Sequence, residues 1–496
     1  MLKRVNVNEK SELNAAATSE AGSGASNDKK YRNNVEIPQV RIGDAEFPQP
    51  FRSGLEYASP ARGTWNIVHT GMLIPEAHEI FVCASCCLRG VVLTAAEMGA
   101  MDRFSTVEIR EHNLLDGDME ELVIEGVSDI INKLPKRPPA VLVYTSCVHH
   151  FTGVDLDMIY EMLRERFPDI DFTDCYMNPI MRKSGMTPDQ LMRSRLYTML
   201  HEREINPRAV AIIGNDLPTD EDSELMYILK SNNFTVREIT SCKSYEEYQE
   251  MAESAYYISY YPDAAPGGDM LADRLGGKHI KMNFSFDYEE IDETFAELAG
   301  ALGINPRKPS DIADARRLCE EELASTKELV GDTPITIDYT YCTRPLGLAK
   351  MLLTHGFNVQ KVYLDAVSGG DKEAFDYLKR KYPDLILEPT VHAGMRFANT
   401  ANAETDIWTD NDKDNNEEKK VKDRVGVRVL ALGQKGAYFE NTNHFVNLVE
   451  GGGMMGYEAI YRTARLMREA YENEKDMEKL VGIKGLGCES GCCSDI

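Results

Sequence analysis

The sequence predicts an α/β protein with parallel sheets, and two observations support this prediction. Apolar, strand-like runs alternate with helical patterns from about residue 42 onward. These strand–helix–strand units form three successive blocks, a repetition that favours parallel sheets with right-handed crossovers. A chain of 496 residues is also too long for a single hydrophobic core. We therefore expect several domains built on the same plan.

The first block contains two strands that each end at a cysteine. The apolar run Ile80–Val82 is followed by Cys83, and the run Val141–Thr145 is followed by Ser146 and Cys147. Helical patterns come after each strand, because apolar residues recur there with the spacing of one helix face. These helices are expected over residues 91–98, 119–134 and 156–166.

The second block begins with the β-branched run 209–213, which ends in a turn signal at residues 214–216. A helix and two further strands are expected over residues 223–231, 235–239 and 255–260. The third block repeats the alternation of strand and helix. Its elements are expected over residues 335–339, 346–355, 359–364, 372–381 and 385–387.

Segments without apolar periodicity divide the rest of the chain. Residues 1–35 are rich in Asn, Ser, Ala, Gly and Lys, a composition typical of a disordered tail. Residues 405–424 are almost wholly polar and charged, which indicates a surface insertion. We expect a disordered tail over 1–45, a first domain over 46–205 and a second over 206–325. A third domain over 326–480 would carry the insertion 405–424, and a Cys-rich tail would occupy 481–496.

The charge of the chain excludes several classes of partner. The formal net charge is −26, so the protein repels nucleic acid and anionic lipid surfaces. No run of 18 apolar residues exists, and no membrane span is expected. The N-terminus lacks the apolar core of a secretion signal, and eleven cysteines do not suggest a disulfide framework. These features favour a reducing, cytoplasmic location in which thiols remain available to metals.

A cysteine cluster in the first block suggests metal chemistry. Cys83, Cys86 and Cys87 lie within five residues at one strand end, and Cys147 lies at another. Ligands of open α/β sheets gather outside the carboxyl ends of strands. Thiolates there suit an iron–sulfur cluster or zinc, and the spacing does not choose between the two metals. The alternative is that these cysteines pack in the core as small hydrophobic residues.

Other cysteines and histidines give weaker signals. Cys488, Cys492 and Cys493 form a second cluster near the C-terminus. This cluster would serve as a second metal site, as a redox relay or as an arm that handles a metallocluster. The alternative is a mobile tail with incidental thiols. The pair His149 and His150 would hydrogen-bond a sulfur or face solvent. Four isolated cysteines are expected to be structural, namely Cys175, Cys242, Cys319 and Cys342. No G-x-x-x-x-G-K-[ST] loop is present, so the chain has no nucleotide-phosphate motif of its own.

Several of these motifs resemble those of component 1 of nitrogenase and of the nitrogenase-like reductases. Cys83 followed by Arg89–Val92 resembles the first cluster cysteine of that family. Thr145–Cys147 followed by Gly153 and Asp155 resembles its third cluster cysteine. Two weaker matches are Lys281–Phe284 in the second block and Gly456–Ile460 in the third.

This resemblance implies three Rossmann-like, doubly wound domains and an iron–sulfur cluster, either [4Fe–4S] or P-cluster-like, at a subunit interface. Cys83, Cys147 and one or both of Cys86 and Cys87 would ligate the cluster. An ATP-dependent iron-protein reductase would supply electrons, and the chain would form a homodimer or pair with a related second subunit. Electrons would pass to a substrate or an additional metallocofactor in the cleft between the three domains.

The sequence also departs from the family pattern. No cysteine occurs in the interval 101–132, where the family has its middle cluster cysteine, so Cys86 or Cys87 would substitute for it. No cysteine lies near Tyr260 and no histidine near Met454, the positions at which nitrogenase anchors its catalytic cofactor. We therefore expect a nitrogenase-like oxidoreductase that does not reduce dinitrogen. Its substrate and catalytic residues are left unassigned.

Three other functions fit the same sequence. A metallocluster assembly scaffold would share the fold and lack the cofactor ligands. A non-catalytic binding protein would use zinc at the four cysteines for stability alone. A partner subunit would leave the catalytic site to a companion chain.

Overall fold

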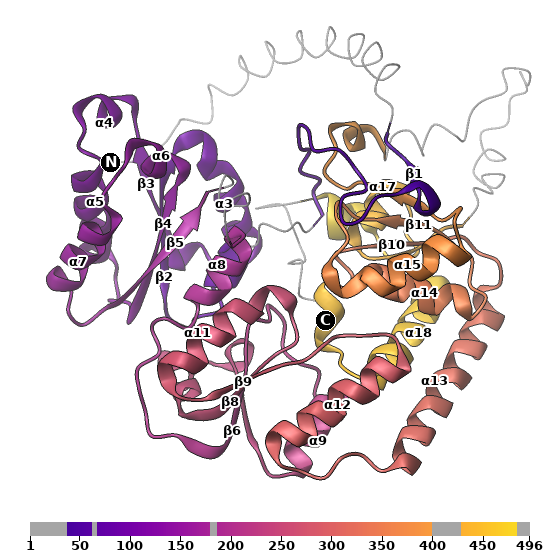
Figure 1. Ribbon diagram of the computed structural model, residues 1–496. Helices are drawn as coiled ribbons and strands as arrows, with labels where there is room; N and C mark the ends of the chain where they lie inside the picture. Colours follow the sequence, from indigo (N-terminus) through magenta and orange to yellow (C-terminus); the bar gives the residue numbers. More distant parts are fainter. Residues whose placement is uncertain (1–36, 62–66, 179–185, 399–427, 484–496) are drawn as a thin grey trace, which may run out of the picture.

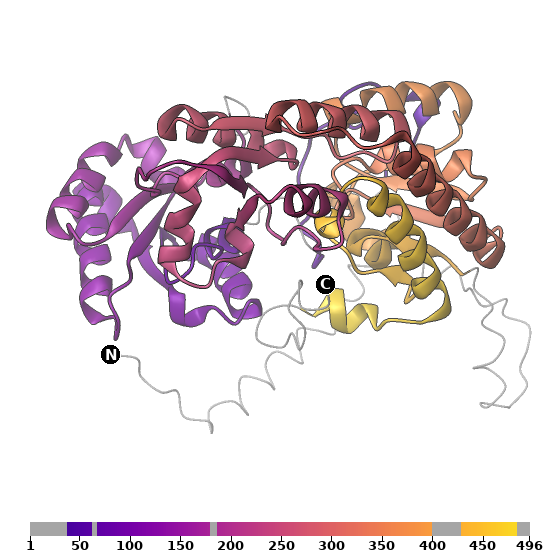
Figure 2. The ribbon, with the colours of Figure 1, turned by 90° about the horizontal axis from the view of Figure 1, so that it is seen from below.

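The computed structural model describes residues 37–61, 67–178, 186–398 and 428–483. It contains three sheets, each flanked by helices, and so confirms the expected α/β class with parallel sheets (Figure 1). The second domain lies between the first and the third (Figure 2). One hydrophobic core is shared by the first and second domains and another by the second and third.

The first domain has a four-stranded parallel sheet with the order β3-β2-β4-β5. Its strands are β2 (His78–Ala84), β3 (Phe104–Ile109), β4 (Ala140–Ser146) and β5 (Asp171–Met177). Its helices are α2 (Ile67–Gly71), α3 (Ser85–Glu97), α4 (Glu111–Asp116), α5 (Met119–Lys133), α6 (Cys147–Thr152), α7 (Leu156–Arg166) and α8 (Pro188–Arg195).

Both faces of this sheet are covered, which explains why its central strands are almost entirely apolar. Side chains of one face, such as Val82 and Val143, pack against α5 and α7. Side chains of the other face, such as Phe81 and Tyr144, pack against α2, α3 and α8. Every residue of β4 is buried, as its continuous apolar run predicts.

The second domain has a four-stranded parallel sheet with the order β7-β6-β8-β9. Its strands are β6 (Asn206–Ile212), β7 (Thr235–Glu238), β8 (Ser254–Ser259) and β9 (Lys278–Lys281). Its helices are α9 (Glu224–Ser231), α10 (Tyr245–Gln249), α11 (Ala265–Leu275) and α12 (Tyr288–Leu302).

The third domain has a six-stranded sheet with the order β1-β12-β11-β10-β13-β14. Its strands are β1 (Val40–Arg41), β10 (Ile335–Asp338), β11 (Val359–Tyr363), β12 (Ile386–Glu388), β13 (Leu430–Leu432) and β14 (Phe445–Val446). Its helices are α13 (Pro309–Val330), α14 (Pro345–Thr354), α15 (Lys372–Lys381), α17 (Gln434–Glu440) and α18 (Tyr457–Glu472).

The chain before the first domain belongs to the third one. Strand β1 pairs antiparallel with β12, and the Tyr57 N–H donates to the Val391 carbonyl at 2.7 Å. Ile42 is fully buried in the core shared by the second and third domains. Residues 37–45 therefore do not belong to the expected tail, and the first domain does not begin at residue 46. A two-residue strand paired with a segment more than 340 residues away leaves no local sequence signal.

Helix α13 also lies on the other side of the expected boundary at 325/326. It packs along α18, where the Cys319 thiol donates to the Tyr457 carbonyl and the Thr326 hydroxyl to the Ala464 carbonyl. The third domain thus begins near Pro309. At the other end, Val481 is fully buried, so the expected Cys-rich tail begins after it. The expected disorder of residues 1–36, the insertion 405–424 and the cysteines after residue 483 lie outside the described residues.

A glycine-rich turn, η10 (Glu450–Gly453), fixes the third domain against the second. Gly453 has a φ of 72°, and its carbonyl accepts from the Asp220 N–H at 2.9 Å. A Cβ atom at Gly453 would lie 2.0 Å from the Pro218 carbonyl oxygen. The close approach of the two backbones therefore requires glycine at this position.

We predict that Gly453→Ala lowers the thermal midpoint, because alanine disfavours positive φ and collides with a backbone carbonyl, at a cost of about 1–3 kcal/mol or more. Gly300→Ala is the matched control, since Gly300 lies at an exposed position of α12 and its Cβ would meet nothing within 4 Å. Differential scanning fluorimetry of both variants checks the prediction. Equal midpoints would show that the turn does not hold the two domains together.

Candidate metal centre

The two cysteine-bearing strands of the first domain are parallel neighbours. Val82 of β2 pairs with Thr145 of β4, so Cys83 and Cys147 follow this pair at the same edge of the sheet. The chain runs from β2 outward to β3 on one side and to β4 and β5 on the other. This edge is therefore the switch point of the sheet, where open α/β folds have their ligand crevice.

Four thiols surround this switch point and are called the thiol face below: Cys83, Cys86, Cys87 and Cys147. Cys83 is fully buried at the end of β2. Cys86 and Cys87 are exposed in the first turn of α3, and Cys147 is partly exposed as the first residue of α6. The sheet thus presents two or three accessible sulfurs above one buried sulfur.

The thiols of this face influence one another electrostatically. Burial, and to a smaller extent the neighbouring thiols of Cys87, Cys86 and Cys147, raise the pKa of Cys83 to about 12. Burial, and then a contact of 3.9 Å between the Cys87 and Cys86 sulfurs, raises the pKa of Cys87. Without a metal, Cys83 and Cys87 are therefore protonated at neutral pH. A bound metal would stabilise the thiolates and displace these protons.

Rigid packing beneath the thiol face holds the two strand ends in place. The rings of Phe81 and Tyr144 stack with centroids 4.0 Å apart across β2 and β4. The Tyr144 hydroxyl donates to the Ile67 carbonyl at 2.9 Å, which ties the strand pair to α2. Further on, Gly153 ends α6 with a φ of 70° and Asp155 caps α7.

The two histidines after Cys147 differ in their surroundings. His149 is buried, and its Nδ1 accepts from the Ser146 N–H at 3.1 Å, so the imidazole caps its own helix. Burial lowers the pKa of His149 and keeps the ring neutral. His150 is exposed and lies edge-on to Phe151.

Exposed apolar side chains come from the helices at the same sheet edge. Phe151 on α6 is 69% exposed, Leu115 on α4 is 86% exposed and Leu93 on α3 is 38% exposed. Only Val91 and Ala95 of α3 are buried. The sequence analysis missed these residues, although apolar residues on short helices next to the cysteines were a usable signal. Large apolar side chains around exposed thiols indicate a contact surface for another chain.

The donor set fits a cluster that is completed across such a surface. Within the described part of the chain, no three His, Cys, Asp or Glu side chains converge tightly enough to hold one metal ion. A structural zinc site gathers four donors around a single ion. The thiol face is open instead, and its cysteines would hold an iron–sulfur cluster.

The remaining described cysteines lie away from this face. Cys175, Cys319 and Cys342 are buried among core side chains, and Cys242 is partly buried. Burial raises the pKa of the Cys242 thiol to about 11 and that of the Cys319 thiol to about 12. Cys488, Cys492 and Cys493 lie outside the described residues, so their role as a second site stays a prediction.

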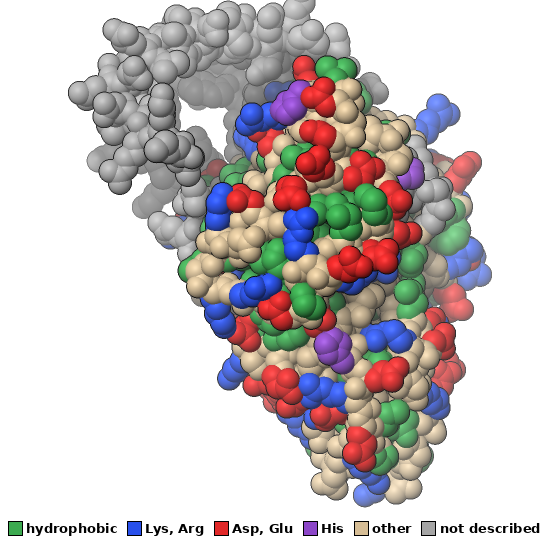
Figure 3. All heavy atoms as spheres, turned by 90° about the vertical axis from the view of Figure 1, so that its left-hand side faces the viewer, with side chains coloured by type: hydrophobic (Ala, Val, Ile, Leu, Met, Phe, Trp, Pro, Cys, Tyr) green, Lys and Arg blue, Asp and Glu red, His purple; other side chains and the backbone are tan. Residues whose placement is uncertain are grey.

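A groove of about 830 Å³ runs beside edge strand β5 in the same domain. Its two arginines have partners, because Arg195 pairs with Asp174 at 2.8 Å and Arg164 lies over the ring of Tyr160. The exposed face of the first domain mixes acidic, basic and hydrophobic side chains (Figure 3).

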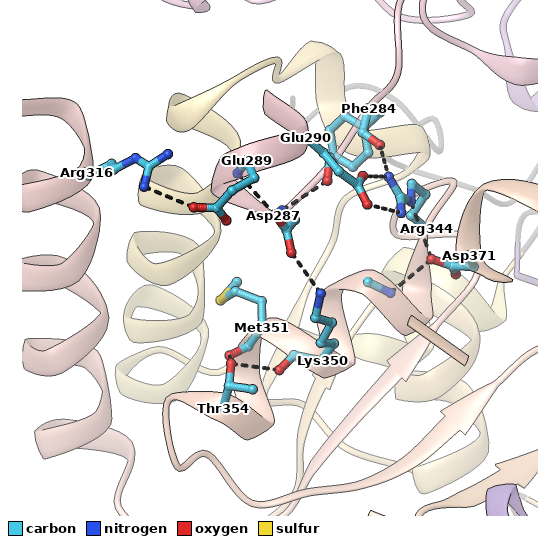
Figure 4. A network of polar contacts seen from close by, with 12 residues as sticks. Phe284, Asp287, Glu289, Glu290, Arg316, Arg344, Lys350, Met351, Thr354 and Asp371 are labelled. Atoms are coloured by element: carbon cyan, nitrogen blue, oxygen red, sulfur yellow. Dashed lines mark hydrogen bonds and ion pairs between the residues drawn. The ribbon is translucent and has the colours of Figure 1, made fainter. Parts of the chain in front are cut away.

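A smaller cavity of about 130 Å³ lies between the second and third domains. Its walls carry ion pairs: Lys350 with Asp287 at 2.7 Å, and Arg344 with Glu290 (Figure 4). Arg344 Nε also lies 3.5 Å from Asp371, whose pKa burial raises to about 6. These contacts join α12 to α14, so the cavity belongs to a domain contact.

The fold and the thiol face together define a three-domain α/β protein with a candidate metal centre at the edge of its first sheet. The model of the family of nitrogenase component 1 type oxidoreductases matches residues 69–463. The chain belongs to this family. Proteins of this family work with an iron-protein component and oligomerise.

Solved structures give the same fold assignment. The structure "Nitrogenase Cp1 at pH 6.5" has a TM-score of 0.59 and 13% sequence identity, over 86% of this chain and 95% of that one. The structure "Nitrogenase Cp1 at pH 5" has a TM-score of 0.52 and 14% identity, over 87% of this chain and 94% of that one. No curated protein sequence gives a significant match. Among the described residues, no helix is both long and apolar enough to cross a membrane.

We predict that the metal-free protein is alkylated at Cys86 faster than at Cys83, because Cys83 is buried and protonated and the thiolate is the nucleophile. Iodoacetamide at pH 8 followed by peptide mass spectrometry measures both rates. Cys175, which is equally buried, serves as the unreactive reference. Equal labelling of Cys83 and Cys86 in folded protein would contradict the described thiol face.

Proposed function

We propose that this chain is an iron–sulfur subunit of the component 1 type that accepts electrons from an ATP-dependent iron-protein reductase. The observation that supports this proposal is the meeting of four thiols at the switch point of the first sheet. An iron–sulfur cluster bound there would supply one-electron transfer. Since the sequence has no nucleotide-phosphate loop, ATP would be hydrolysed on the partner.

Different residues of the thiol face would ligate the cluster from its buried side and from its exposed side. Cys83 would hold it from below, where the packed rings of Phe81 and Tyr144 exclude water. Cys147 and one or both of Cys86 and Cys87 would hold it from the exposed side. The exposed side chains of Leu93, Leu115 and Phe151 would then meet a second subunit or the reductase.

The sequence gives one expectation about the substrate. The positions near Tyr260 and Met454 hold no cysteine or histidine, so reduction of dinitrogen through the usual cofactor is not expected. An assembly scaffold would share the thiol face but would not sustain turnover. A non-catalytic zinc protein would hold zinc with four donors around one ion and would be isolated without iron.

Anaerobic purification followed by iron, sulfide and zinc analysis tests the metal. We expect iron and sulfide in equal amounts, and visible absorbance that bleaches when an iron-protein reductase and MgATP are added. Zinc without iron would contradict the proposed function. Bleaching without sustained turnover of any substrate would favour the scaffold.

We predict that Cys83→Ala or Cys147→Ala abolishes the cluster absorbance, because each removes a ligand that the sheet places at the switch point. Cys175→Ala removes an equally buried thiol from the same sheet, and Cys319→Ala removes one from α13. Both controls should keep the iron content of the wild type. Equal iron in all four variants would refute the ligand assignment.

We predict that anaerobic chelation of iron weakens the association of subunits, since a shared cluster bridges two chains. Light scattering after size exclusion should show a shift from dimer toward monomer at micromolar concentration. Reconstitution with iron and sulfide should restore the dimer. An unchanged mass after complete iron removal would show that the cluster does not bridge subunits.

A further inference from the structure

The ligand crevice of the second sheet is filled by a side chain of the first domain. Its switch point lies between β6 and β8, which lead into Gly214–Asp216 and Tyr260–Tyr261. Arg193 of α8 enters there with its side chain only 1% exposed. Its Nη1 donates to the Gly214 carbonyl at 2.5 Å and to Asp216 at 2.7 Å.

Further contacts enclose this guanidinium. Nε donates to Asp189 at 2.8 Å, Nη2 to Asp216 at 3.2 Å, and the guanidinium lies 4.2 Å from the ring centroid of Tyr261. From the third domain, Glu450 approaches Nη2 to 4.0 Å. We call this group of Arg193, Asp189, Asp216, Tyr261 and Glu450 the Arg193 joint.

The third domain closes the remaining space with backbone. Glu450 has a φ of 52°, which turns the chain into the glycines that follow. Gly453 touches Pro218, and a Cβ atom at Gly456 would lie 2.3 Å from Glu224. Glycines at these positions let the turn lie directly on the second domain.

Several potential metal ligands near the junction are engaged within the protein, and the Cys342 thiol, one residue after Tyr341, is buried in the core. The Tyr260 hydroxyl lies 3.0 Å from that of Thr219, and Met454 and Met455 are buried in the core. His444 is the nearest histidine along the sequence, and its Nδ1 lies 3.0 Å from the Ala470 carbonyl oxygen. In the residues that the structure describes, the Arg193 joint contains neither a thiol nor an imidazole.

We infer that the junction of the three domains in this subunit is a closed ionic joint and holds no second metallocofactor. Among the residues that the structure describes, the thiol face is then the candidate site for metal, and Cys488, Cys492 and Cys493 lie outside these residues. A substrate has to reach that face or a site on a companion chain. This inference rests on the proposed function, because it takes the thiol face as the metal centre.

Metal analysis of variants of the anaerobically purified protein tests where in the chain the metal is bound. We expect the double variant Cys83→Ala/Cys147→Ala to retain no iron, molybdenum, vanadium, nickel or cobalt above background. Arg193→Met should keep the wild-type metal content per chain. Metal that survives in the double variant and is lost in Arg193→Met would overturn the inference.

Hydrogen exchange tests the joint independently of any metal. Amides of residues 450–456 should exchange slowly in the wild type and at least tenfold faster in Arg193→Met, because a buried carboxylate loses its partner. Asp216→Asn is a milder variant and should give the same direction. Arg317→Met, on the exposed face of α13, is the control without effect.

Failure of the closed joint and failure of the proposed function give different experimental results. Exchange of residues 450–456 at the rate of an exposed loop in the wild type would overturn the closed joint. A wild-type protein without iron would overturn the proposed function, and the exchange rates would then decide the joint alone.

Discussion

The parallel pairing of β2 with β4 is the constraint on which the candidate centre depends. Val82 lies opposite Thr145, so the two strands end close together. Cys83, the next residue of β2, and Cys147, which follows Ser146 at the end of β4, therefore lie at one edge. The stacked rings of Phe81 and Tyr144 fix this register. A slip of one residue would turn alternate side chains to the opposite face and separate the sulfurs.

A second set of contacts fills the junction of the three domains and leaves no room for a ligand there. Arg193 reaches from the first domain into the second and meets Glu450 of the third. The ion pairs Lys350–Asp287 and Arg344–Glu290 join the second and third domains nearby. The domain surfaces are thus used for charge pairing, whereas the thiol face stays open to solvent. This contrast suits a subunit whose redox site is shared with another chain.

Much of this fold was predictable, because buried parallel strands read as continuous apolar runs. The helices Leu156–Arg166 and Lys372–Lys381 have the predicted bounds. Edge strands β3 and β5 were missed, since polar residues alternate in them and the apolar signal is weak. The placement of the cysteines at one edge of the sheet followed from topology, but the Arg193 joint did not. The sequence around an arginine on a helix does not indicate that its ion-pair partners lie in two other domains.

The most direct measurement is an anaerobic crystal structure of the metal-loaded protein with anomalous diffraction at the iron edge. Iron density should lie within bonding distance of the Cys83 and Cys147 sulfurs and at a contact between two chains. Anomalous density between the three domains, or density at the zinc edge alone, would contradict a single iron–sulfur centre at the edge of the first sheet.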